Sequence, residues 1–148
     1  MSLESDVKAL ARLPIFSAFE PEALKLIAFA AEPVKFGAGD VLFRNGEVSD
    51  AGFLILSGSI MLDLGHGTMD NGKIVGPGAL IGELALLAPT VHPSTAIARE
   101  NATTLKLPRS LIRRVLEEFP ESARRAREAL RQEIEKFGDE LDKARRAL

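Results

Sequence analysis

The sequence predicts a mainly β fold with flanking helices, in which an antiparallel β-roll or jelly roll lies between N-terminal helices and a long C-terminal helix. Residues 33–108 contain short apolar runs separated by turns, and 11 of the 12 glycines fall there. Short strands at this spacing are typical of antiparallel sandwiches and rolls, whereas parallel sheets need alternating strands and helices. After residue 120, apolar residues recur every three or four positions, which predicts one long helix.

Length and composition limit what this protein can be. A chain of 148 residues, 46% of them hydrophobic, is long enough for one domain with its own core, so we expect residues 1–148 to form one unit. The net charge of −2 gives no general attraction to nucleic acid or to membranes, and no apolar run approaches the roughly 20 residues of a membrane span. Because the chain has no cysteine and no signal peptide, we expect a cytoplasmic protein.

Two helices are expected in residues 1–32. Between residues 3 and 13 the apolar side chains share one face at helical spacing, and Pro14 ends this run. A second helix is expected to begin at Pro21, because proline is favoured at the first helical position, and Leu24 and Ile27 belong to its apolar stripe.

The middle zone, residues 33–108, is expected to form six to eight short strands. The apolar runs that predict them are 34–36, 41–43, 53–56, 60–64, 74–75, 96–98 and 105–107. Residues 65–67 read Gly-His-Gly, which is typical of a hairpin loop, so His66 is expected to be an exposed turn residue.

The last zone, residues 110–148, is helical and charged. Ser110 is a plausible N-cap for a helix over 111–119, and Pro120 can begin the next helix. The apolar positions of this next helix are close to a heptad seam, and they are Ala123, Ala126, Leu130, Ile134, Phe137, Leu141, Ala144 and Leu148. Charges of both signs occupy the other faces.

A helix of nearly thirty residues has more apolar surface than a small β domain can cover. We therefore expect its distal half to form a parallel homodimer through Leu130, Ile134, Phe137 and Leu141. The alternative is that the stripe folds back on its own domain. The arginine-rich piece 124–127 could suggest nucleic-acid binding, but the interleaved glutamates favour a solvated helix face.

The candidate functional site lies in residues 76–95. A backbone that approaches a phosphate needs small residues and outward-pointing N–H groups, and Gly82 followed by a short turn at 84–86 can supply both. Glu83 is a single carboxylate inside an apolar run. Because a carboxylate repels phosphate, we expect Glu83 to face sugar hydroxyls instead.

Residues 82–87, Gly-Glu-Leu-Ala-Leu-Leu, resemble the phosphate-binding cassette of cyclic-nucleotide-binding domains. This family includes the catabolite activator protein, regulators of cyclic-nucleotide-dependent kinases, and gated channels. The resemblance implies a β-roll that binds cAMP or cGMP and needs no other cofactor. It places Glu83 on the ribose 2′-hydroxyl, and the backbone of Gly82, Leu84 and Ala85 near the phosphate. Three further glycines fall on family positions, although turn formation alone would explain them: Gly39, Gly46 and Gly58.

His92 and Pro93 depart from the family pattern at the phosphate end. The family has an arginine nine residues after the glutamate, and His92 holds that position here. An imidazole offers an anion one donor and is partly protonated at neutral pH, and Pro93 lacks a backbone N–H. Together the two changes weaken phosphate binding by about two to three powers of ten. The small positions that follow are Ser94 and Thr95, and the candidates for a replacement cation are Arg44 and Arg99.

Three functions are compatible with these residues. The first is a regulatory module that binds cAMP or cGMP and signals through the C-terminal helix. In the second, His92 is an ordinary loop residue, and the chain is a degenerate, non-binding relative that acts as a dimerisation or protein-interaction module. The third is a sensor of another small anion.

An enzyme and a direct DNA binder are both disfavoured. The chain has no cysteine nucleophile, and its two histidines form no plausible triad with a serine and a third member. No residues have the spacing of metal ligands. Transcription factors of the family that this chain resembles continue after the long helix into a helix-turn-helix, and the sequence stops at residue 148. We therefore expect no direct DNA binding by this chain.

Overall fold

The computed structural model describes residues 2–63 and 72–147. In the last helix, α4 (Pro120–Ala147), the side chains at positions 130, 133, 137, 140, 141, 144 and 147 lie outside the description. The predicted hairpin loop with His66 therefore falls outside the described residues. The same holds for three of the four side chains predicted for a dimer interface, those of Leu130, Phe137 and Leu141.

Two helices precede the sheets, as predicted. α1 spans Leu3–Ala11 and begins with a capping box, in which the side chains of Ser2 and Ser5 each accept a hydrogen bond from the other residue's backbone N–H. α2 spans Pro21–Ala30 and begins at the proline, whose fixed φ and missing N–H suit the first position of a helix.

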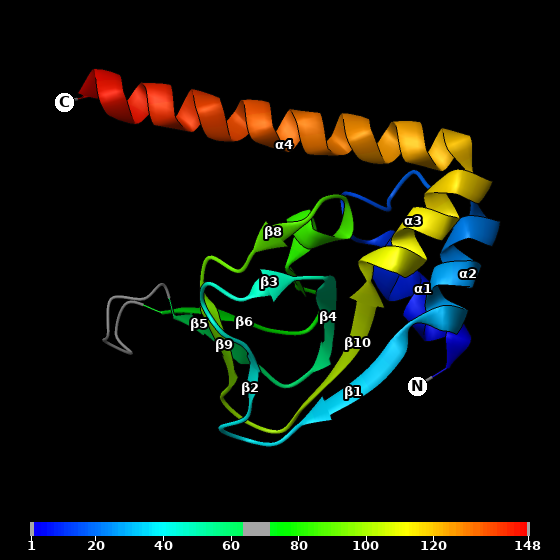
Figure 1. Cartoon of the computed structure of the whole chain (residues 1–148), viewed down its shortest axis with the longest axis horizontal. Helices are drawn as coiled ribbons and strands as arrows, with labels where there is room; N and C mark the ends of the chain where they lie inside the picture. The colour runs from blue at the N-terminus through cyan, green and yellow to red at the C-terminus, as the bar shows by residue number, and fades with distance from the viewer. Residues whose placement is uncertain (1, 64–71, 148) are drawn as a thin grey trace.

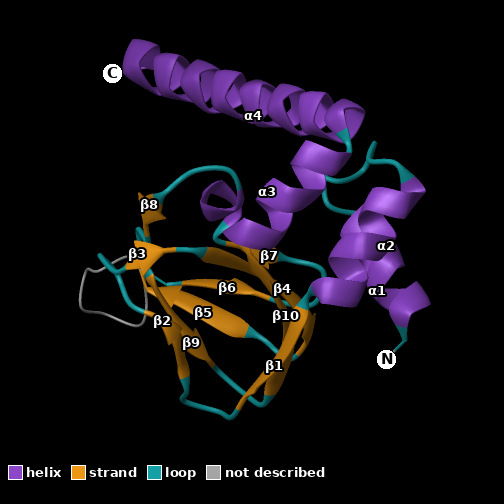
Figure 2. Cartoon of the chain, turned by 45° about the vertical axis from the view of Figure 1, so that its right-hand side comes forward, coloured by secondary structure: helices purple, strands orange, loops and turns teal. Residues whose placement is uncertain are grey.

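Short antiparallel strands make up the middle of the chain and confirm the predicted fold class (Figures 1 and 2). They are β1 (Glu32–Phe36), β2 (Val41–Phe43), β3 (Val48–Ser49), β4 (Ala51–Ser57), β5 (Ile60–Asp63), β6 (Lys73–Val75), β7 (Leu80–Ile81), β8 (Thr90–Val91), β9 (Thr95–Ala98) and β10 (Ala102–Pro108). The sequence patterns missed β3, β7 and β8, because a strand of two residues is too short to show alternation.

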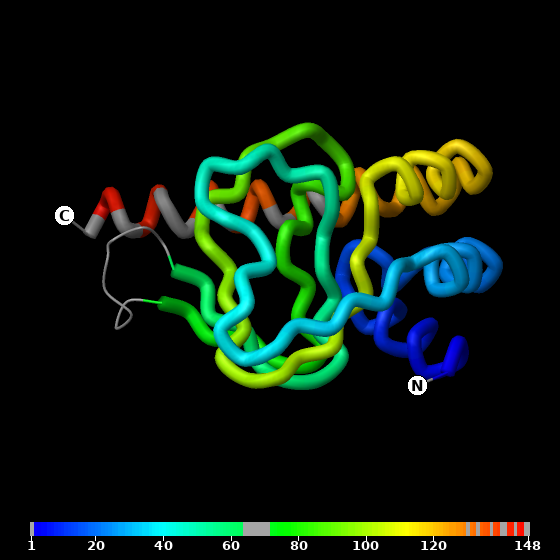
Figure 3. Tube along the Cα trace, turned by 60° about the horizontal axis from the view of Figure 1, so that its bottom comes forward, coloured from blue at the N-terminus to red at the C-terminus, as the bar shows by residue number. Residues whose placement is uncertain are grey.

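The strands form two four-stranded sheets, in the orders β1-β10-β4-β7 and β2-β9-β5-β6, and the separate pair β3-β8. In Figure 3 the chain winds around the interior of this roll, and α1, α2 and α3 (Arg109–Glu118) lie beside one end of it. Between β7 and β8 the chain makes a short 3-10 helix, η2 (Glu83–Leu86).

Two hydrophobic cores share strand β4. Successive side chains of a strand point to opposite faces, so Leu54 packs among the helices while Phe53 and Ile55 fill the interior of the roll. The helical core contains buried residues from α1, α2, α3 and β10, and it also includes Leu86 of η2. The 3-10 helix is therefore anchored to the helical side of the molecule.

The start of α3 differs from the prediction. The predicted N-cap, Ser110, lies inside the first turn, because β10 runs directly into a helix that begins at Arg109. Pro108 takes the N-cap position in an extended conformation and makes no side-chain hydrogen bond there. Ser110 is exposed.

Helix α4 begins at Pro120, as predicted, and the domain buries residues in its first part. Ala123 and Ala126 are buried, and Ser122 Oγ accepts a hydrogen bond from the backbone N–H of Glu20 at 3.2 Å. The helix then extends past β8 to the other side of the roll (Figure 1). Ile134, in this distal part, is 59% exposed.

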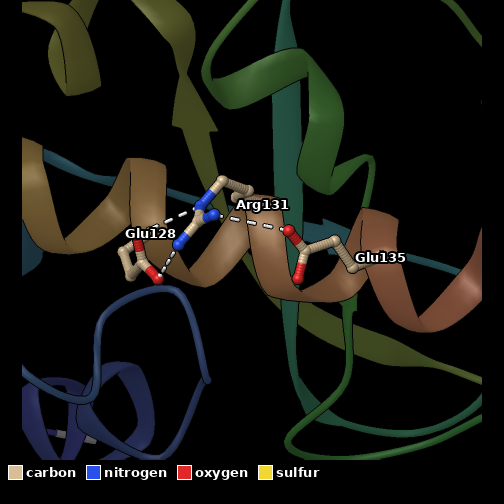
Figure 4. A network of polar contacts seen from close by, with 3 residues as sticks. All are labelled: Glu128, Arg131 and Glu135. Carbon is tan, nitrogen blue, oxygen red and sulfur yellow. Dashed lines mark hydrogen bonds and ion pairs between the residues drawn. The ribbon is translucent and has the colours of Figure 1, made fainter.

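Ion pairs follow the distal surface of α4. Arg131 lies between Glu128 and Glu135 and contacts both carboxylates (Figure 4). Such exposed pairs along a helix stabilise it by only about 0.3–0.5 kcal/mol each.

None of the helices in the described ranges combines the length and apolarity that crossing a membrane requires.

Candidate functional site

The predicted cassette packs its backbone directly against strand β4. Gly82 lies between β7 and η2 as the N-cap of η2, with φ +79°, in the left-handed region that suits glycine. A Cβ on Gly82 would lie 3.0 Å from the carbonyl oxygen of Ala51, and a Cβ on Gly52 would lie 3.3 Å from the carbonyl oxygen of Gly82. Two glycines that face each other thus allow the close approach that fixes the 3-10 helix in place.

A cavity of about 390 Å³ opens between η2 and the segment that contains β8. Its lining consists of Phe43, Ser49, Leu62, Leu80, Ile81, Gly82, Glu83, Leu84, Ala85, Thr90, Val91, His92, Pro93 and Ser94. Six of the seven residues predicted for the ligand site are among them. The seventh, Thr95, is not, and its Oγ1 accepts a hydrogen bond from the backbone N–H of Asn45 at 2.9 Å.

The second side of the cavity is held by strand pairing and by an aromatic stack. β8 pairs with β3 so that Thr90 lies opposite Ser49, and the backbone N–H of His92 donates to the carbonyl oxygen of Glu47 at 2.9 Å. The ring of His92 stacks on Phe43, with centroids 3.6 Å apart and an angle of 8° between the planes.

Burial decides the charge of His92, which is only 6% exposed. Desolvation lowers the pKa of its imidazole from the ordinary 6.5, and the nearby carboxylates of Glu47 and Asp50 oppose this effect more weakly. The imidazole is therefore mainly neutral at neutral pH and does not supply the positive charge of an arginine.

Among the described residues, no lysine or arginine lines the cavity in place of that arginine. Neither Arg44 nor Arg99 lines the cavity, and the described lining contains no lysine or arginine. The segment 64–71, which lies outside the described residues, contains no lysine or arginine in its sequence either. Glu83 is the charged residue of the described lining.

Ser49 is a site residue that the sequence did not reveal. It is 1% exposed and lines the cavity, and its Oγ has no hydrogen-bond partner among the described residues. A buried hydroxyl normally has a partner, and this one has none among the described residues. The sequence gives no signal for it, because its burial depends on the pairing of β3 with a strand about forty residues further along the chain.

Arg109 was also missed, because a charged residue at the start of a helix suggests a solvated position. Its Nη1 donates to the carbonyl oxygens of Ser49 at 2.9 Å and of Ala85 and Ala88 at 3.4 Å. One guanidinium thus connects β3, η2 and the start of α3.

A larger hollow of about 490 Å³ lies between residues 14–18 and α4, and it is a weaker candidate. Arg124, Arg125 and Lys136 contribute to its lining, and all three are exposed. Arg125 already donates to the carbonyl oxygen of Ala18. The cavity beside Gly82 has the buried polar groups that orient a small ligand, and its volume falls in the range of roughly 300–1,000 Å³ typical of ligand sites.

Comparison with known proteins shows the family of the segment that contains this cavity. The family model described as "Cyclic nucleotide-binding domain" matches residues 33–119, more than half of the chain. The chain belongs to this family. The match includes the roll, η2, β8 and helix α3 of the domain.

Three similar proteins show the range of contexts in which this cyclic nucleotide-binding domain occurs. "Lysophospholipase NTE1" of Pyricularia oryzae is 34% identical over 68% of this chain, which spans 7% of that protein. The "CRP-like cAMP-activated global transcriptional regulator" of Mycobacterium tuberculosis is 26% identical over 89% of this chain and 60% of the regulator. The structure of a "Cyclic nucleotide-binding-like protein" from Brucella abortus has a TM-score of 0.68 and 38% identity, covering 76% of this chain and 98% of that one.

Proposed function

We propose that this domain is a regulatory ligand sensor whose cavity beside Gly82 takes a small sugar-bearing molecule, with cAMP and cGMP as the reference ligands. The observation that carries the proposal is that the cavity brings together the cassette, Gly82 to Ala85, and the segment His92 to Ser94. Glu83 would accept hydrogen bonds from the sugar hydroxyls, and α4 would carry the signal onward.

The position of η2 supports this route for the signal. Leu86 of η2 is buried in the same core as residues of α3, and Arg109 ties η2 to the first residue of that helix. α4 follows α3 after Phe119. A ligand that shifts η2 would therefore act on the base of α4 through packed contacts.

Thermal unfolding with cAMP and cGMP tests the proposal. A ligand present at one hundred times its dissociation constant stabilises the folded state by about 2.7 kcal/mol. Glu83→Gln should abolish this shift, whereas Glu118→Gln, an exposed position on α3, should leave it unchanged. A shift in melting temperature of the same size in the Glu83→Gln protein would show that Glu83 does not bind the ligand.

The distal half of α4 is proposed to form a homodimer through Leu130, Ile134, Phe137 and Leu141. The exposure of Ile134 supports this, because a large apolar side chain on an uncovered helix face gains from a partner. Ile134→Glu should lower the mass in solution measured by light scattering, and Lys143→Glu, an exposed residue of the same helix, should not. An equal mass for all three proteins would contradict the seam.

The second candidate function is a non-binding dimerisation or interaction module. It is favoured by the neutral, stacked state of His92 and by a described lining without lysine or arginine. In either case we propose that the domain itself is not an enzyme and does not bind DNA directly. A cytoplasmic location stays a prediction.

A further inference from the structure

The buried polar groups of the cavity are uncharged. Ser49, His92 and Ser94 each line the cavity with no more than 6% of their surface exposed. Two hydroxyls and a mainly neutral imidazole can donate and accept hydrogen bonds, but they bring no positive charge. The rest of the lining is largely apolar, and it includes Leu62, Leu80 and Ile81.

Ser49 is the observation that points to a bound molecule. Two other buried hydroxyls have partners: Ser122 Oγ accepts from the backbone N–H of Glu20, and Thr104 Oγ1 donates to the carbonyl oxygen of Val34 at 3.0 Å. Ser49 Oγ is as buried as these and has no partner within the described part of the chain. Leaving a buried hydroxyl without a hydrogen bond costs free energy. The missing partner of Ser49 Oγ is therefore best explained by a ligand that forms a hydrogen bond with it.

An anion is poorly suited to this cavity. A phosphate removed from water needs a cation or several donors, and the described lining contains no lysine or arginine. Pro93 offers no N–H, and the ring of His92 is packed against Phe43.

We propose that the cavity selects an uncharged, hydroxyl-bearing ligand with a flat apolar part, and that it binds a nucleoside more tightly than the corresponding cyclic phosphate. This inference rests on the proposed ligand-sensing function and names the chemical class of the ligand. Ser49 and Ser94 would bind the hydroxyl groups of the ligand, and the apolar lining would cover its ring.

The direct test compares adenosine and guanosine with cAMP and cGMP on the full chain by calorimetry. At least one nucleoside should bind at least tenfold more tightly than its cyclic phosphate, and its affinity should not change between low and high salt, because no charge is paired. A cyclic phosphate that binds equally or more tightly would overturn this inference and leave the sensor function standing. No binding by any of the four compounds would contradict both.

Ser49→Ala examines the residue at the centre of the inference. The variant should melt at the same temperature as the parent or higher without ligand, because its hydroxyl has no partner to lose, and it should bind the nucleoside at least tenfold more weakly. Ser122→Ala is the matched control: it removes a satisfied buried hydroxyl, so it should lower the melting temperature and leave the affinity unchanged. Unaltered affinity in the Ser49→Ala protein would be evidence against the assignment.

His92→Arg tests the role of charge from the opposite direction. A guanidinium in the cavity should raise the affinity for cyclic phosphates by roughly 10- to 100-fold and have little effect on nucleosides. An unchanged preference in a folded His92→Arg protein would show that charge does not set the choice. If the larger side chain prevents folding, the Ser49→Ala measurement still decides the inference.

Discussion

The two sides of the cavity are built in different ways. On the cassette side, Gly82 to Leu86, the position of the chain is set by backbone against backbone, where Gly82 and Gly52 allow a close approach that any side chain would obstruct. On the opposite side, Thr90 to Ser94, it is set by a two-residue strand pair and by the stack of His92 on Phe43. The cassette side holds the glycine and the glutamate of the sequence motif, and on the opposite side His92 holds the position at which the resemblance predicts an arginine. Close backbone packing thus fixes the first side, and side-chain contacts fix the second.

The strongest test of this comparison is Gly82→Ala. The left-handed φ and the contact of the new Cβ with Ala51 at 3.0 Å should together lower the free energy of unfolding by about 2 to 4 kcal/mol. Gly78 also has a positive φ, but nothing lies within 4 Å of its Cβ position, so Gly78→Ala should cost only about 1 to 2 kcal/mol. Denaturant unfolding measures both, and equal losses would show that the close approach is unimportant.

Arg109 connects the two sides, because its guanidinium bonds to β3 and to η2 at once. Arg109→Met keeps much of the side-chain bulk and removes the donors, so it should lower the free energy of unfolding by about 1.5 to 3 kcal/mol. Arg113→Met, one turn later on the exposed face of α3, should change it by less than about 0.5 kcal/mol. Similar losses of unfolding free energy in the two variants would show that the hydrogen bonds of Arg109 do not hold the two sides together.

His92→Ala tests the opposite side alone. Loss of the stack on Phe43 should lower the free energy of unfolding by about 1 to 3 kcal/mol, because the ring is nearly fully buried. Val91→Ala, next to it and 58% exposed, is expected to have little effect. If His92→Ala is as mild as Val91→Ala, the stack does not hold this side in place.

The smallest expected effect is a dependence on pH. Burial lowers the pKa of His92 in the folded protein, so the unfolded chain binds a proton more readily. The stability from a neutral His92 is therefore present above pH 6.5, the ordinary pKa, and is lost as the pH falls below it. Glu47 and Asp50 reduce the effect by favouring the proton.

Unfolding curves between pH 7.5 and 5.5 measure this effect, with His92→Phe as the comparison. Most carboxylates titrate below this window, and His66 is common to both proteins, so the difference between the curves reports on His92. The parent should lose more stability than the variant as the pH falls. Parallel curves would mean that the imidazole titrates as it does in water.

The cassette side was predictable from the sequence, and the opposite side was only partly so. Gly82 and Glu83 fall in a short motif whose backbone demands are visible in the residues themselves. The burial of Ser49 and the stack of His92 on Phe43 depend on segments about forty to fifty residues apart, and no local periodicity records such contacts. The heptad spacing predicted α4 but not the burial of Ser122 at its base, since that depends on the contact with the N-terminal segment at Glu20.

The length of α4 has a mechanical consequence. A helix of 28 residues, at 1.5 Å per residue, is about 42 Å long, and its base is fixed to the domain by the buried residues Ser122, Ala123 and Ala126. Treated as a rigid rod, it moves its tip by about 7 Å for a tilt of roughly 10° at Pro120. A displacement of η2 too small to disturb the roll would thus be magnified severalfold at the end of the rod, where another molecule could read it.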